Sequence, residues 1–254
     1  MIQSYSIQPS LNNAYARARR AKQHLTRFKR ETRAFWRSFR PSKGYINPKA
    51  GGTIRIQLSQ SLIPAMLGIL IGETIYNLRA TLDYLVYELA ILDSGQIQKD
   101  TQFPIEDTES GWQLHMNGTK RGKVFDWGCY LRGLTPSHKA CIKLLQPCYG
   151  CRWTDILRSV SNPDKHKTLT IVRATQTLSV KPVTKGPVFL NPSVEGKTTL
   201  FHVKINPKDE TMDMNADLTF QIAFDDGLPV VETIEELHRQ VIHVLDIFYP
   251  DFKK

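Results

Sequence analysis

Apolar residues recur at steps of three and four between Leu11 and Phe39, which predicts one long amphipathic helix. Ser10 can cap the start of this helix, and Pro41 ends it. The apolar stripe consists of Leu11, Tyr15, Ala18, Ala21, Leu25, Phe28, Phe35 and Phe39. The remaining faces carry arginine and lysine, so the predicted helix is basic on every side that is not buried.

A second long helix is predicted from about residue 64 to about residue 92, and its stretch GETIYNLRATLDYLVYEL (72–89) sorts its side chains by face. At 100° per residue, one side collects Leu78, Leu82, Leu85 and Leu89. The opposite arc, roughly 120° wide, collects Glu73, Tyr76, Arg79, Asp83 and Tyr87, with Asn77 beside it. This arc is either a solvated face with a helical ion pair or a polar patch turned toward a groove or a partner. Only four of residues 64–91 are charged, which favours the polar patch.

Between residues 169 and 224, β-branched and aromatic runs alternate with Pro, Gly, Asn and Asp, which predicts antiparallel strands. The expected fold class is α+β. A helical N-terminal half (the long basic helix plus antiparallel helix packing) is followed by a small antiparallel sheet and a closing C-terminal helix. We expect a single domain, 1–254. Its helical part covers about 1–166 with a short strand near 53–58, its β-rich part about 167–228, and its closing helix about 232–248.

The positive charge is concentrated at one end of the chain. Residues 1–40 contribute a net +9 to a total formal charge of +10. This concentration of positive charge predicts contacts to the phosphates of nucleic acid. The alternatives are an acidic protein partner, a dimer contact, an anionic membrane or a merely solvated face. The candidate nucleic-acid-binding residues are Arg17, Arg20, Arg27, Arg30 and Lys165.

The longest apolar run, residues 61–72, is shorter than the roughly 20 residues that span a membrane. The N-terminus has neither a basic nor an apolar signal region, so we expect a cytoplasmic protein without membrane contact. Cys148 and Cys151 form a CxxC pair that could bind zinc, but no second ligand pair accompanies it, which favours free thiols. Sequence signatures of P-loop, Rossmann, zincin and serine-hydrolase sites are missing, and we expect no metal and no cofactor.

Several motifs together resemble those of a group of uncharacterised bacterial proteins. They are GExxxNLRxxLDxL from Gly72, TQFPI from Thr101, LLQPCYG from Leu144 and NPDKHK from Asn162, preceded by RAKQH from Arg20. The motifs span about residues 20–167, and the resemblance implies no activity.

A wider resemblance is to HEPN domains, helical modules that often cleave RNA without a metal. The arginine and histidine of their Arg-x4-His signature converge from two subunits, where arginine holds the scissile phosphate and histidine moves a proton. Here Arg79 is followed by Tyr84 where the histidine would stand, and the reference pKa of tyrosine, about 10, makes it a poor base. His166 is the best substitute, since it lies in an expected turn between a helix and a strand.

The function expected from the sequence is that of a HEPN-like protein that associates with nucleic acid, RNA in particular, as a homodimer. In a bacterial or phage-defence setting it would be a divergent RNA endonuclease or a degenerate binder. The alternative is a non-catalytic scaffold or dimerisation module with a protein partner. The candidate catalytic residues are Arg79, Asp83, His166, Glu73 and Asn77.

Overall fold

The computed structural model of the protein describes the backbone of residues 8–38, 42–43, 53–59, 64–117, 130–166, 173–182, 189–195, 198–204, 214–224 and 226–253. Side chains are described for 8–35, 37, 64–113, 130–161, 222–224 and 226–253. The chain divides into two compact units, Met1–Lys29 with Gly68–Ile171 and Val230–Lys254, and Arg30–Leu67 with Val172–Pro229. The single domain 1–254 stays a prediction, because two compact units can belong to one folding unit.

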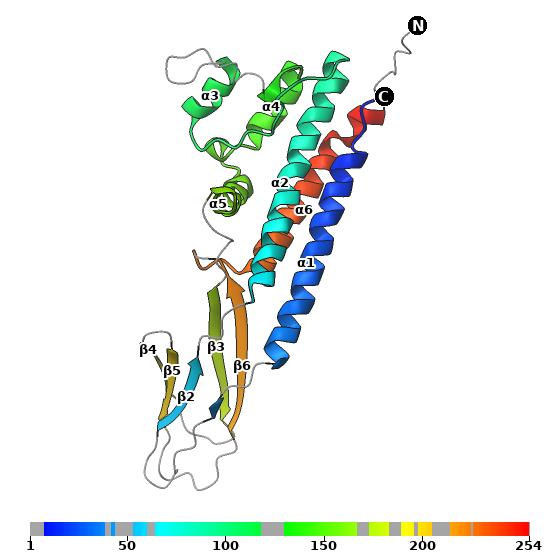
Figure 1. Ribbon diagram of the computed structural model, residues 1–254. Coiled ribbons are helices and arrows are strands. Elements are labelled where there is room, and N and C mark those ends of the chain that lie inside the picture. Colours follow the sequence, from blue (N-terminus) through cyan, green and yellow to red (C-terminus); the bar gives the residue numbers. More distant parts are fainter. Residues whose placement is uncertain are drawn as a thin grey trace. The chain divides into compact units, whose positions relative to one another are not determined.

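The first unit is built from helices (Figure 1). The helical elements are α1 (Asn12–Ser38), α2 (Ala65–Ser94), α3 (Glu109–Asn117), α4 (Pro136–Leu144), α5 (Arg152–His166) and α6 (Val230–Phe248), with 3-10 turns η3 (Pro147–Tyr149) and η4 (Tyr249–Lys253). Among the described residues, no helix has both the length and the apolar composition needed to cross a lipid bilayer.

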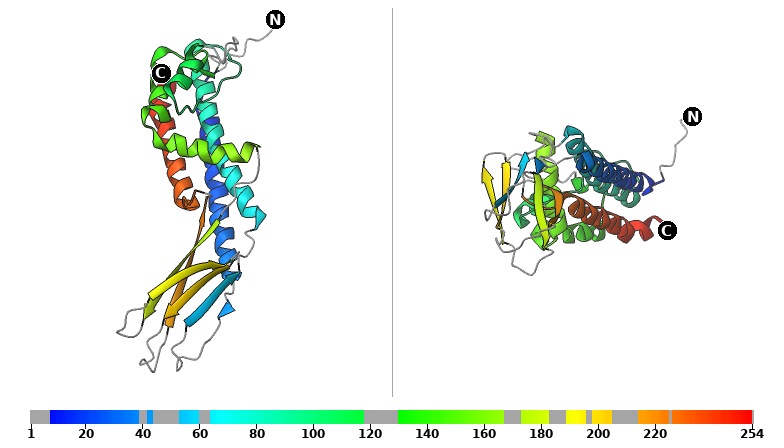
Figure 2. Two further views of the ribbon diagram at one scale, coloured as in Figure 1. Left: turned by 90° about the vertical axis from the view of Figure 1, so that its left-hand side faces the viewer. Right: turned by 90° about the horizontal axis from the view of Figure 1, so that it is seen from below.

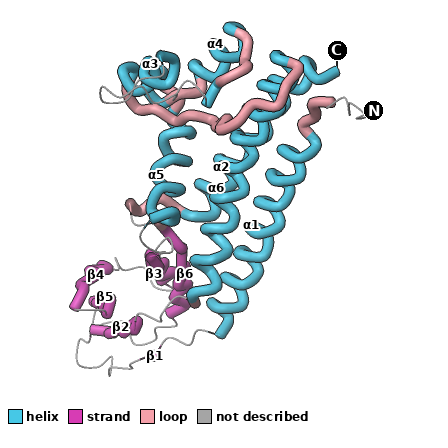
Figure 3. Tube along the Cα trace, turned by 45° about the horizontal axis from the view of Figure 1, so that its top comes forward, coloured by secondary structure: helices cyan, strands magenta, loops and turns pink. Residues whose placement is uncertain are grey.

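Helix α1 lies beside both α2 and α6, as the views in Figures 2 and 3 agree. Toward α6, Tyr15 donates to Asp246 at 2.7 Å, and His238 Nε2 lies 3.1 Å from the Ala18 carbonyl oxygen. The contacts run to higher numbers on α6 as they run to lower numbers on α1, so these helices are antiparallel. The same holds between α1 and α2, where His24 faces Glu73 and Arg17 faces Asn77.

The buried interior of this unit follows the apolar stripes. On α1, Ala14, Ala18, Ala21, Leu25 and Phe28 are all buried. The leucine stripe predicted for α2 is buried completely, since Leu78, Leu82, Leu85 and Leu89 are each 0% exposed. Because these helices carry their apolar side chains on one face, burial against neighbouring helices stabilises them more than helix propensity alone.

The second unit contains the extended segments. The strands are β1 (Ser42–Lys43), β2 (Thr53–Ser59), β3 (Arg173–Pro182), β4 (Phe189–Glu195), β5 (Thr198–Lys204) and β6 (Met214–Ala223). Strands β1, β2, β5 and β4 pair in that order, and β3 pairs separately with β6. All pairs are antiparallel; Ile56 of β2 opposes Phe201, for example, and Thr177 of β3 opposes Thr219.

The expected fold class, α+β with a small antiparallel sheet, is wrong, because helices account for 76% of the residues whose side chains the structure describes, and those residues hold only one very short strand pair. Among the residues whose side chains are described, the only strand structure is the end of β6 and an isolated β-bridge between Ala223 and Pro229. The physical reason lies in the core. Among the side chains that the structure describes, nearly all buried apolar ones belong to helices and their connections, and the end of β6 adds only Ile222 and Ala223. Alternating β-branched runs predicted strands, but they could not show which elements form the core.

Replacement of Leu82 by alanine tests the α2 stripe. Leu82 is 0% exposed, so the substitution removes buried apolar area and leaves a cavity, and we expect the free energy of unfolding to fall by about 2–5 kcal/mol. Urea denaturation measures this change. The matched control is Leu144→Ala, since Leu144 is 71% exposed and its truncation costs within about 0.5 kcal/mol. Equal losses for the two variants would contradict the burial assigned to this stripe.

Candidate nucleic-acid interface

The polar arc of α2 divides into two parts with different neighbours. Glu73 and Asn77, near its N-terminal end, face α1. Arg79 and Asp83, one turn later, face the segment 101–107 that follows α2. Four of the five residues predicted to form one catalytic group therefore lie on one helix but contact two different elements.

Arg79 and Asp83 hold both backbone polar groups of Phe103. The guanidinium of Arg79 donates from Nη2 to the Phe103 carbonyl oxygen, and Asp83 Oδ1 accepts from the Phe103 N–H at 2.9 Å. Arg79 Nη2 also lies 3.7 Å from Asp83 Oδ1. The Phe103 side chain is fully buried, so its peptide groups need these partners in place of water.

The Arg79 guanidinium lies in a largely dry position, since its side chain is only 15% exposed. Burial lowers the pKa of Arg79, while the charges of Asp83 and Tyr130 oppose that shift. Its Nη1 atom is buried and has no hydrogen-bond acceptor among the residues that the structure describes. Arg79 and Asp83 thus have a structural role at Phe103. Their catalytic role stays a prediction.

The QPCYG turn holds the same segment from its other side. Gln146 Oε1 accepts from the Glu106 N–H at 3.0 Å, and the Cys148 N–H donates to the Glu106 carbonyl oxygen at 3.2 Å. Gln146 is itself fully buried and donates from Nε2 to the Ile142 carbonyl oxygen. Motif residues from two other parts of the sequence, α2 and the QPCYG turn, thus converge on residues 103–106.

Helix α1 presents the arginine surface, which we define as Arg19, Arg20, Arg27 and Arg30. All four side chains are exposed, and the only acidic residue of α1 is Glu31, which pairs with Arg30 at 2.9 Å. Arg20 donates to Gln23 at 3.3 Å, a neutral partner that leaves its charge uncompensated at this contact. This surface points away from the buried stripe of α1.

Three other cations of α1, Arg17, Lys22 and Lys29, have partners on neighbouring helices. Lys22 and Lys29 both pair with Glu235 of α6, and the hydrogen bond from Lys29 lowers the pKa of Glu235. Arg17, named from the sequence as a phosphate contact, is half-buried; it donates to Asn77 Oδ1 at 3.4 Å and lies 5.5 Å from the centre of the Tyr84 ring. The basic residues therefore split into a structural set and an exposed set.

His24 joins the arginine surface to α2. Its Nε2 lies 3.7 Å from Glu73 Oε2, too far for a hydrogen bond, and that nitrogen is buried without a partner among the described residues. Burial lowers the pKa of His24, and the nearby charges of Arg20 and Arg27 lower it further against the opposing effect of Glu73. His24 therefore lies close to two cations and one exposed carboxylate.

His166 and Lys165 cannot be placed with this group, because their side chains lie outside the described residues. Their backbone belongs to α5, which continues to His166. The expectation of a turn after Asn162 is therefore wrong, since the helix runs past Pro163.

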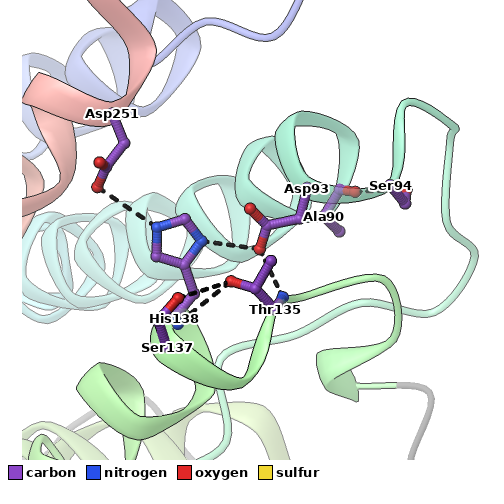
Figure 4. A network of polar contacts seen from close by, with 7 residues as sticks. All are labelled: Ala90, Asp93, Ser94, Thr135, Ser137, His138 and Asp251. Atoms are coloured by element: carbon purple, nitrogen blue, oxygen red, sulfur yellow. Dashed lines mark hydrogen bonds and ion pairs between the residues drawn. The ribbon is translucent and has the colours of Figure 1, made fainter. Parts of the chain in front are cut away.

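A polar network centred on His138 has no counterpart in the sequence-based candidates (Figure 4). His138 Nδ1 lies 2.7 Å from Asp93 Oδ2 at the end of α2, and Nε2 lies 3.4 Å from Asp251 Oδ2 in η4. The same Asp93 oxygen accepts from the Thr135 N–H at 2.6 Å, and Thr135 caps α4. Both ring nitrogens face carboxylates, so the network fastens three elements and leaves neither nitrogen open to a substrate. Thr135 and Pro136 indicate that a helix begins just before His138. Nothing in the sequence indicates its partners Asp93 and Asp251, which are 45 and 113 positions away.

Comparisons add no relative to this geometry: no family model matches the chain, and neither the curated proteins nor the solved structures contain a match. Within the described part of the chain, no group of three or more His, Cys, Asp or Glu side chains could hold a metal ion. Cys141, Cys148 and Cys151 are free thiols.

Replacement of Asp83 by alanine tests the contact with Phe103. The variant leaves the buried Phe103 N–H without an acceptor, so we expect the free energy of unfolding to fall by about 1–3 kcal/mol. Hydrogen exchange at the Phe103 amide should accelerate as well.

The control is Asp107→Ala, which removes an exposed carboxylate paired with Arg158 at 2.8 Å and should cost at most about 1 kcal/mol. An Asp83→Ala protein as stable as the control, with unchanged exchange at Phe103, would contradict the assigned contact.

Proposed function

We propose that the protein binds nucleic acid through the arginine surface of α1. The observation that carries this proposal is the exposure of Arg19, Arg20, Arg27 and Arg30 on a helix with one acidic residue, while the lysines of the same helix are paired with α6. Like charges clustered on a surface repel one another and gain free energy when a polyanion approaches.

Arginine suits phosphate in particular. Its planar guanidinium can donate two parallel hydrogen bonds to phosphate oxygens, and it stays charged at every physiological pH. Each phosphate contact releases condensed counterions, so the affinity of such a surface for nucleic acid falls steeply with salt. The contacts read the backbone and not the bases, so binding is largely independent of sequence.

The HEPN resemblance supports RNA as the nucleic acid and Arg79, Asp83, Glu73, Asn77 and His166 as the residues to examine for cleavage. Binding does not depend on that chemistry. Arg79 and Asp83 are engaged with Phe103, whereas the arginine surface is exposed on another helix. The proposed binding therefore depends on α1 alone, and it does not require that the protein cleaves RNA.

The test replaces Arg19, Arg20 and Arg27 together by glutamine and measures binding to a short RNA by fluorescence anisotropy at several salt concentrations. We expect the affinity to fall about tenfold or more at low salt, and the slope of log K against log salt to become shallower by about 2.

The control variant removes the same charge elsewhere, by replacing the exposed cations Lys99, Arg152 and Lys253 with glutamine. Its affinity and salt slope should stay near those of the unmodified protein. If the two triple variants lose affinity equally, the binding reflects net charge and not the arginine surface. If the unmodified protein binds no nucleic acid at low salt, the proposed function is wrong.

A further inference from the structure

The edge between α1 and α2 carries more than positive charge. Arg17, Arg20, His24 and Arg27 follow one another at steps of three and four residues, so they lie in a row along α1. Arg27 lies seven positions after Arg20, about 10.5 Å along the helix axis. Glu73 of α2 faces this row at His24, between the two exposed arginines.

Glu73 is an exposed carboxylate in a basic surrounding. Its side chain is 52% exposed, and its 3.7 Å separation from His24 Nε2 is too long for a direct hydrogen bond. The oxygens of Glu73 can therefore accept hydrogen bonds from a ligand. A carboxylate repels phosphate but accepts a hydrogen bond from a hydroxyl group. On a nucleic-acid strand held by the arginines, Glu73 would therefore bind a hydroxyl group.

Tyr76 lies one helical turn after Glu73 and is 55% exposed. An exposed aromatic ring beside a cationic row is the arrangement that binds single strands, because an unpaired base stacks on the ring while arginines follow the backbone. A duplex offers no open base face to such a ring.

We propose that this edge selects single-stranded RNA, with Arg20 and Arg27 at the phosphates, Tyr76 stacked on a base, and Glu73 accepting a hydrogen bond from a ribose 2′-hydroxyl. The inference rests on the proposed nucleic-acid binding and adds the class of ligand. The 2′-hydroxyl is the group by which a protein distinguishes RNA from DNA at one position. A DNA strand leaves the Glu73 carboxylate without its donor.

The experiment measures the affinity of three oligonucleotides by anisotropy at one salt concentration: a single-stranded RNA, the single-stranded DNA of the same sequence, and the RNA duplex. The unmodified protein should bind the RNA strand about tenfold more tightly than the DNA strand, as expected for a hydrogen bond to a charged group. It should also bind the single strand more tightly than the duplex.

Glu73→Ala should abolish the difference between RNA and DNA, by weakening RNA binding and leaving DNA binding equal or stronger. The matched control is Glu236→Ala, which removes an acid that is 42% exposed on α6 and should preserve the difference. Tyr76→Ala should weaken RNA and DNA strands alike by about 5- to 150-fold, while Tyr76→Phe keeps the ring and the affinity. Unchanged thermal unfolding midpoints show that the variants fold.

Equal affinities of the unmodified protein for RNA and DNA strands, or an RNA preference that survives Glu73→Ala, would overturn this inference and leave nucleic-acid binding intact. Failure of all three oligonucleotides to bind at low salt would instead remove the proposed function itself.

Discussion

A buried peptide group must keep its hydrogen bonds, and at Phe103 this requirement ties the middle of the chain to α2. The Phe103 side chain is fully buried, so its N–H and carbonyl groups cannot turn to water. Asp83 supplies the acceptor and Arg79 supplies the donor. Because Arg79 Nη2 lies 3.7 Å from Asp83 Oδ1, the positive charge of the guanidinium and the negative charge of the carboxylate offset each other. Three residues later, Gln146 and Cys148 bind the backbone of Glu106, so the turn that precedes α5 is positioned by the same segment.

This constraint gives the polar residues of α2 a physical explanation. Arg79 and Asp83 are needed to dock residues 101–107, and Asn77 joins α2 to Arg17 of α1. On α1, the lysines pair with Glu235, whereas Arg19, Arg20, Arg27 and Arg30 are exposed. The docking contacts of α2 and the binding that we propose for the arginine surface thus involve different charged residues, with Glu73 and Tyr76 at the edge of that surface.

Much of the helical part was predictable because it depends on local periodicity. The spacing of apolar residues is sufficient to locate α1 and α2 and to identify Leu78, Leu82, Leu85 and Leu89 as buried. The class of fold was not predictable in this way, since strand-like runs do not reveal whether a sheet or a set of helices supplies the core. Partners of polar residues were equally hidden. Phe103 binds Asp83 through its backbone, which has no sequence signature, and Asp251 lies 113 positions from His138.

The central claim is that bound nucleic acid lies along α1 and its edge with α2. Ultraviolet cross-linking of the protein to a single-stranded RNA, followed by mass spectrometry of the linked peptides, tests it directly. The linked peptides should come from residues 12–30 and from the α2 segment that contains Tyr76. Cross-links confined to other segments, such as α4, α5 or α6, would contradict the assignment of the arginine surface as the binding site.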